Sequence, residues 1–246
     1  MGKLSSLVRF ELSRLLRFPV LEVIVVLAVF NSFTAYMSFY LMGTYTDKTG
    51  GSFIYLIVLD GLRRTFYAMI NYLFISFIYA TLTSSIAHAI SSGLMKNLLS
   101  FPYRRSEVFI VESSVTFMVP FIIYLTAHLL PFPFFYPYPV QIGFGWLKWF
   151  LTVFLSFLYI FSICLTISLA FKTPIPSFIS SVSILYAMSF ITAGLRRNPL
   201  VNFIPPYCFI NSILGHAHVY HLIPSSLLAI ALIAICYIYF TRWLEL

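Results

Sequence analysis

Three histidines lie close together in the sequence, at positions 216, 218 and 221. Imidazole is a common ligand of zinc and copper, so this group is the first candidate for metal chemistry. On a helix, His218 and His221 would share a face and His216 would not. No carboxylate or thiolate pair lies nearby to complete a tetrahedral site. The sequence favours a solvated loop here, leaves metal binding open, and predicts no cofactor in this chain.

Motifs of the common enzymes are absent or incomplete. Asp60 begins a DGLRR stretch that is similar to the start of the phosphatidyltransferase metal motif, but that chemistry needs several further aspartates. The other aspartate is Asp47, which precedes it. There is no G-x-S-x-G hydrolase turn and no G-x-x-x-x-G-K-[ST] phosphate loop. We expect a protein that is not an enzyme, and any ATP and Mg²⁺ used with it would be bound by another polypeptide.

The composition indicates a protein whose solvent is lipid. Of 246 residues, 61% are hydrophobic and 9% are charged, and the mean hydropathy is +0.95. Soluble domains carry about 25% charged residues. The net charge of +8 comes from residues in the breaks between apolar runs, so anionic lipid is the expected partner and nucleic acid is not.

The apolar runs predict an all-α polytopic membrane protein with six transmembrane helices, because helices satisfy their own backbone groups in lipid. This domain covers 19–246. The six expected spans are Pro19–Met42, Thr65–Ser91, Val108–Leu130, Leu147–Phe171, Ile175–Leu195 and Leu222–Thr241.

Residues 1–18 predict an amphipathic helix that lies flat at the membrane interface. Its leucines fall on one side, and Arg9, Arg14 and Arg17 are expected near lipid phosphates. No small-residue cleavage site follows a short apolar core, so we expect no cleavable signal.

The distribution of Lys and Arg predicts the orientation. With the N-terminus inside, nine of the 15 basic residues fall on the inner side and six on the outer side. We therefore expect a multi-pass protein of the plasma membrane with both termini in the cytoplasm. On the outer side, proline and aromatic residues alternate at 131–139, and 199–221 is too interrupted to span. We expect short re-entrant or surface helices there, packed on protein.

A polar break between the second and third spans reads SSGLMKNLLSFPYRRSEVFIVE, at residues 91–112. Gly93 can end the preceding span in a left-handed conformation, and Pro102 can stop a short helix. Leucines provide an apolar face, and the two arginines can meet acidic groups of a partner. The alternative is a solvated loop whose arginines follow the positive-inside rule.

The order of these parts resembles the membrane subunits of ABC-2 type ATP-binding-cassette exporters, over the whole predicted topology. The sharpest local resemblance is a glycine, a leucine pair, a proline, a basic and an acidic residue at family spacing. Ser91, Lys96 and Glu112 depart from the family pattern. The resemblance implies that residues 92–106 are a coupling helix, which a separate ATPase subunit moves when it binds ATP. The residues expected to couple are Gly93, Met95, Leu98, Leu99, Pro102, Arg104, Arg105 and Glu107.

The resemblance also implies a dimer, with a second copy or a sister subunit, that exports cargo by alternating access. The second and fifth spans would lie near the dimer axis. The mildly polar residues Asn71, Thr83, Ser180 and Ser183 would then line a path for a hydrophobic or amphipathic cargo, with helix packing as the alternative.

Charged groups inside the spans are nearly absent, which weighs against a proton-driven transporter. Glu22 and Glu112 are expected at hydrated inner ends, and His88 and His128 at solvated span ends. The alternative function is a six-span membrane scaffold, or a transporter that is not coupled to an ATPase. The sequence does not name the cargo or distinguish a homodimer from a heterodimer.

Overall fold

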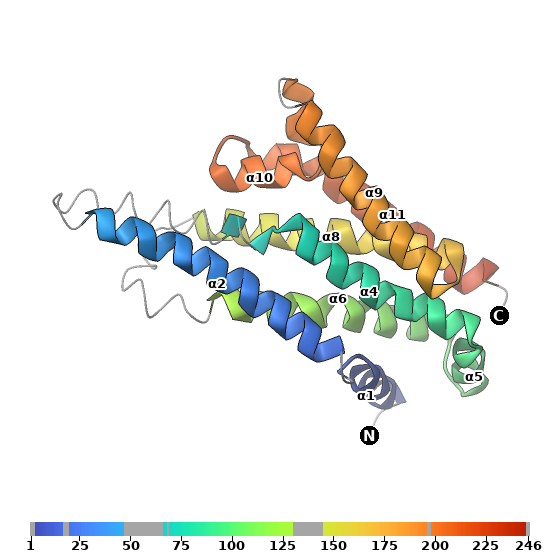
Figure 1. Ribbon diagram of the computed structural model, residues 1–246. Coiled ribbons are helices and arrows are strands. Elements are labelled where there is room, and N and C mark those ends of the chain that lie inside the picture. Colours follow the sequence, from blue (N-terminus) through green and yellow to red (C-terminus); the bar gives the residue numbers. More distant parts are fainter. Residues whose placement is uncertain are drawn as a thin grey trace.

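The computed structural model describes residues 3–16, 20–46, 66–67, 69–129, 145–195 and 198–244. Every regular element within these ranges is a helix (Figure 1). In chain order they are α1 (Lys3–Leu15), α2 (Val20–Thr46), α4 (Tyr72–Ser91), α5 (Leu94–Ser100), α6 (Arg105–Leu129), α8 (Gly145–Phe171), α9 (Pro174–Gly194), η2 (Pro199–Phe203), α10 (Tyr207–Leu214), η3 (Val219–Leu222), α11 (Ile223–Ile238) and η4 (Tyr239–Trp243).

Five described helical segments are long and apolar enough to cross a membrane. They are Tyr72–Ser91, Arg105–Leu129, Leu147–Phe171, Pro174–Gly194 and Val219–Trp243. Their positions agree with five of the six expected spans. The helix at the third expected span, Val108–Leu130, starts earlier than expected, at Arg105, so α6 takes in the end of the polar break. The expected first span falls on α2, whose apolar part within the described side chains is Leu21–Thr34.

The centre of the bundle is formed by α4, α6 and α8. Tyr79 of α4 lies among aromatic rings of α6 and α8, and its hydroxyl donates to the backbone oxygen of Phe117 at 3.0 Å. Edge-to-face packing of such rings stabilises a core beyond the burial of their area. Around this centre, α2 packs on α6, α9 packs on α4 and α8, and α11 packs on α8.

The two outermost helices are much less covered than the central ones. In α4, α6 and α8, 56–61% of the apolar window is buried, against 22% in both α9 and the Val219–Trp243 segment. Phe190 and Ile191 of α9 and Leu227 of α11 are more than half exposed. In a membrane protein, such faces contact lipid or another chain.

The short helices outside the long apolar helices lie at opposite ends of the bundle. Figure 1 places α1, α5 and the C-terminal end of the described chain together at one end, which we call the α1/α5 end. There, Arg105 Nη1 donates to the backbone oxygen of Leu244 at 3.0 Å. Residues 199–221 fold at the other end into η2, α10 and η3, and α10 packs on α8. The proline-aromatic stretch at 131–139 lies outside the described residues.

Candidate functional site

The short helix α5 is set apart from its neighbours by two local breaks. Gly93 has a φ of 76°, a left-handed conformation that ends α4 and turns the chain, as predicted. At the other end, Phe101 is extended, with a ψ of 162°, because the residue before a proline avoids the helical region. The next helix, α6, begins at Arg105, and in its first turn Glu107 Oε2 accepts from the backbone N–H of Arg104 at 2.8 Å.

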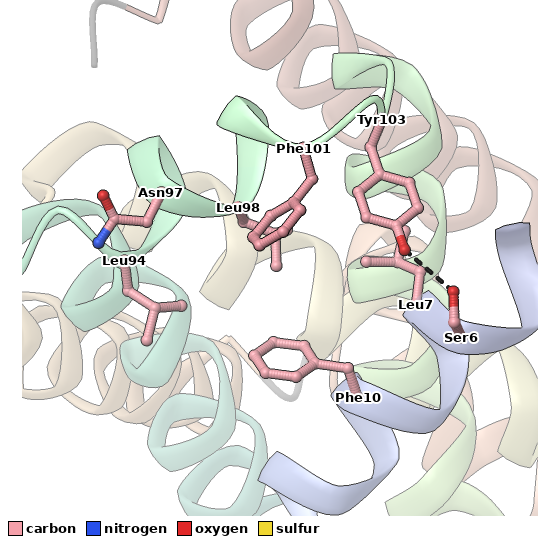
Figure 2. Close-up of a pocket in the computed structure, with 8 residues that line it drawn as sticks. All are labelled: Ser6, Leu7, Phe10, Leu94, Asn97, Leu98, Phe101 and Tyr103. Carbon is pink, nitrogen blue, oxygen red and sulfur yellow. Dashed lines mark hydrogen bonds between the residues drawn. The ribbon is translucent and has the colours of Figure 1, made fainter.

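An apolar groove of about 420 Å³ separates α5 from α1 (Figure 2). A hydrogen bond of 3.0 Å between Ser6 Oγ and Tyr103 Oη connects its two walls. We call this cavity the α1–α5 groove. It is lined by Ser6, Leu7, Phe10, Leu94, Asn97, Leu98, Phe101 and Tyr103.

Three large apolar side chains around the groove are left exposed. Phe101 is 61% exposed, Phe10 is 42% exposed and Leu94 is 37% exposed. They come from the loop, from α1 and from α5, and Figure 2 shows the rings of Phe10 and Phe101 on two sides of the groove. We call these three residues the apolar patch. Exposed apolar groups gathered at one place are typical of an interaction surface.

The leucines and the methionine that were predicted to face a partner differ in how exposed they are in the structure. Met95 is 1% exposed and packs in the core, so it anchors α5 on the bundle instead of facing solvent. Leu98 and Leu99 are half-buried. Phe101 and Phe10, which the sequence analysis did not single out, are the exposed apolar groups. The sequence carries a signal for both, because Phe10 falls outside the buried face of α1 and Phe101 follows the last residue of α5.

A basic pocket lies next to the α1–α5 groove. It has a volume of about 370 Å³ and is lined by Lys96, Leu99, Ser100, Tyr103 and Arg105. Tyr103 lines both cavities. Lys96, Arg104 and Arg105 are exposed, so this end of the molecule can attract an acidic partner surface.

The arginines of α1 differ in their surroundings. Arg9 is exposed, and Arg17 lies outside the described residues. Arg14 does not face lipid phosphates as expected, because its Nη2 lies 2.6 Å from Glu112 Oε1 and 2.9 Å from Glu11 Oε2. Glu112 is 2% exposed and Glu11 is 1% exposed. The expectation of a hydrated Glu112 is therefore wrong, and Glu11 was missed.

The four residues of the expected cargo path differ in their surroundings. Asn71 precedes α4 and donates to Asn31 Oδ1 of α2 at 3.0 Å. Thr83 is fully buried, and its Oγ1 donates to the backbone oxygen of Tyr79. On α9, Ser180 is half-buried and Ser183 is exposed. A path between two copies stays a prediction.

A buried polar network joins α2, α4 and α6 toward the end of the bundle opposite α1 and α5. The amide of Asn31 donates to Tyr124 Oη at 2.5 Å and lies 3.2 Å from His128 Nε2. The other ring nitrogen of His128 lies 2.8 Å from the backbone oxygen of Tyr124. We call Asn31, Asn71, Tyr124 and His128 the amide–histidine network. His128 is fully buried, so the expectation of a solvated histidine is wrong, whereas His88 is exposed.

The histidines at 216, 218 and 221 do not converge on a metal site. Within the described ranges, no three His, Cys, Asp or Glu side chains are grouped to hold an ion. His221 instead caps η3, with its Nδ1 3.1 Å from the backbone nitrogen of His218, and stacks on Tyr220 with ring centroids 4.2 Å apart.

Comparisons with protein-family models, with curated proteins and with solved structures found no match.

Proposed function

We propose that this chain is the membrane-spanning subunit of an ABC-2 type exporter, and that a separate ATPase subunit binds at the α1/α5 end. The observation that carries the proposal is α5 itself. It is a short helix isolated by Gly93 and Pro102, anchored through Met95, and bordered by the exposed apolar patch.

The surface around α5 has the properties of a docking site. Phe10, Leu94 and Phe101 offer apolar area, and exposed basic residues surround it. Binding interfaces commonly combine aromatic anchors at the centre with charged residues at the rim. The partner would present a groove that accepts Phe101 and acidic groups that meet Lys96, Arg104 and Arg105.

The proposal takes α2 as a sixth span and places both termini in the cytoplasm. The helix α2 has 27 residues, which is longer than the roughly 20 residues that cross a bilayer. Eight described basic residues support this orientation because they lie at or near the α1/α5 end of the bundle: Lys3, Arg9, Arg14, Lys96, Arg104, Arg105, Lys172 and Arg242.

The proposal includes a dimer that exports a hydrophobic or amphipathic cargo. The weakly covered faces of α9 and of the Val219–Trp243 segment leave area for a second copy or a sister subunit. Because the described spans hold few charged groups, an uncharged or amphipathic cargo fits better than an ion. The competing function is a membrane scaffold without an ATPase, which predicts no nucleotide-binding partner at α5.

Co-purification in mild detergent tests the proposal. The unaltered chain is expected to retain an ATPase subunit, and Phe101→Asp is expected to reduce the retained amount at least about tenfold, a loss typical of a central anchor. Trp243→Asp is the matched control, because Trp243 is 73% exposed at the same end but lies outside the patch. Equal retention by the two variants, or no ATPase with any chain, contradicts the proposal.

A further inference from the structure

The contact between α1 and α6 contains an acidic residue where an apolar one is expected. Leu7, Glu11 and Leu15 are spaced four residues apart, so they form one line along the helix. They are 1%, 1% and 4% exposed, respectively. Glu11 therefore lies at the middle of the buried stripe that attaches α1 to the bundle.

The described groups that meet Glu11 do not balance its charge. The guanidinium of Arg14 lies between Glu11 and Glu112, and we call these three residues the carboxylate–arginine triad. Glu112 makes the shorter contact, 2.6 Å, as a hydrogen bond. Glu11 Oε2 lies 2.9 Å from the same nitrogen but is not oriented to accept a hydrogen bond, and Arg14 Nε has no hydrogen-bond partner. Two ionised carboxylates and one arginine would leave an uncompensated negative charge out of water, which is costly.

We infer that the carboxylate–arginine triad binds one proton and thereby controls whether α1 stays docked on α6. With the proton on Glu11, the buried group is a neutral acid beside a charge-assisted Arg14–Glu112 pair. Without it, the docked state contains one excess negative charge, and separation of α1 lets water reach Glu11.

Among the residues that the structure describes, the surrounding charges leave this balance to the triad. On α6, Glu107 accepts from the backbone N–H of Arg104 and Arg105 donates to the backbone of Leu244, roughly one to two helical turns away from Glu112. Arg9 on α1, Glu22 on α2 and Lys96 across the groove are exposed. Burial, followed by the charge of Glu112, raises the pKa of Glu11 from 4.5 to about 7, although Arg14 opposes the shift.

The direction of the pH effect follows from which state holds the proton. Below pH 4.5, Glu11 is protonated whether α1 is docked or not, so docking is strongest. As the pH rises from 4.5 to about 7, the undocked state loses its proton first, and docking weakens. Above about pH 7 both states have lost the proton, and docking weakens no further. Because α1 supplies Ser6, Leu7 and Phe10 to the α1–α5 groove, its release also changes that groove.

Distance measurement by double electron–electron resonance tests the inference on the chain alone. Spin labels on Ser13→Cys of α1 and Ser100→Cys of α5, both exposed positions, are introduced after Cys164, Cys208 and Cys236 are replaced by alanine. The ratio of the long-distance to the short-distance population is expected to rise about tenfold between pH 5.5 and pH 8. The same spectra are recorded for Glu11→Gln and Glu112→Gln, each of which removes the excess charge, and both are expected to keep the short distance at both pH values.

The control is Arg9→Gln, a substitution on the exposed side of the same helix, which should keep the full pH response. A distance distribution that does not change with pH overturns the inference, as does a pH response that persists in Glu11→Gln. The pH-dependent docking of α1 on α6 depends on the triad alone and not on the proposed function. Since the experiment contains no ATPase, its failure would leave the docking proposal to be decided by co-purification.

Discussion

Two of the buried polar clusters within the described residues differ in how their charges balance. The amide–histidine network joins α2, α4 and α6 through neutral amide, phenol and imidazole groups, and the Asn31 amide reaches both Tyr124 and His128. The carboxylate–arginine triad joins α1 to α6 with two carboxylates and one guanidinium, and it leaves Arg14 Nε without a partner. A satisfied neutral network fixes one arrangement, whereas an unbalanced charged cluster can change with its protonation. The amide–histidine network therefore stabilises one arrangement of α2, α4 and α6. The carboxylate–arginine triad makes the attachment of α1 to α6 depend on protonation.

The largest effect is expected from removing the single cation of the triad. Arg14→Gln leaves two buried carboxylates without a counter-charge, and at pH 8 we expect a loss of about 3 kcal/mol in the free energy of unfolding. Unfolding in mixed micelles measures it. Arg9→Gln, on the exposed side of the same helix, should change the free energy by less than about 0.5 kcal/mol. Similar losses in the two variants would show that Arg14 does not stabilise the protein by neutralising buried carboxylates.

Breaking the neutral network should cost somewhat less. Asn31→Leu leaves the Asn71 amide, the Tyr124 hydroxyl and the His128 ring without their shared partner, at an expected cost of about 2–3 kcal/mol. The same unfolding assay checks this value. Asn97→Leu replaces an exposed asparagine on α5 and should be nearly neutral. If Asn31→Leu is also neutral, the network does not join the three helices.

The unbalanced charge predicts that one substitution in the triad stabilises the protein. Glu11→Gln is expected to raise the free energy of unfolding at pH 8 by about 2 kcal/mol. At pH 4 the gain should vanish, because Glu11 is then protonated in the folded and the unfolded chain. Unfolding curves across this pH range measure the difference. A destabilised Glu11→Gln at pH 8 would mean that Glu11 is ionised and needed as an anion.

The smallest effect concerns the turn that separates α4 from α5. Gly93 has a φ of 76° with open space around its Cα, so Gly93→Ala should cost about 1 kcal/mol from backbone strain alone. Gly194→Ala is the matched control, because no atom lies near an added Cβ there and the φ is not positive. It should be neutral or slightly stabilising. Equal effects in unfolding assays would remove Gly93 as the residue that sets the turn.

Hydrophobic runs were sufficient to predict most of the helices, because a bilayer requires long apolar segments that satisfy their own backbone groups. Five of the expected spans correspond to candidate spanning helices within the described residues. The Gly93 turn and the end of α5 before Pro102 were also predictable, since both follow from local backbone sterics.

The side-chain partners could not be predicted in the same way. Glu11 and Glu112 are far apart in the sequence, and only the packing of α1 on α6 places both on Arg14. The spacing of Glu11 between Leu7 and Leu15 was the available signal, and the sequence analysis did not single it out. Met95 was expected to face a partner and is buried instead, because helical spacing does not tell which side of so short a helix meets the bundle. Phe101, which was not singled out, is exposed.

Photo-crosslinking from Phe101 in intact membranes tests the central claim most directly. A benzoyl-phenylalanine placed at position 101 is irradiated in cells, and the crosslinked proteins are identified by mass spectrometry, with the same group at position 243 as the control. The account predicts that position 101 captures a protein with a phosphate-binding loop and that position 243 does not. Capture of lipid alone, or of the same proteins from both positions, would contradict it.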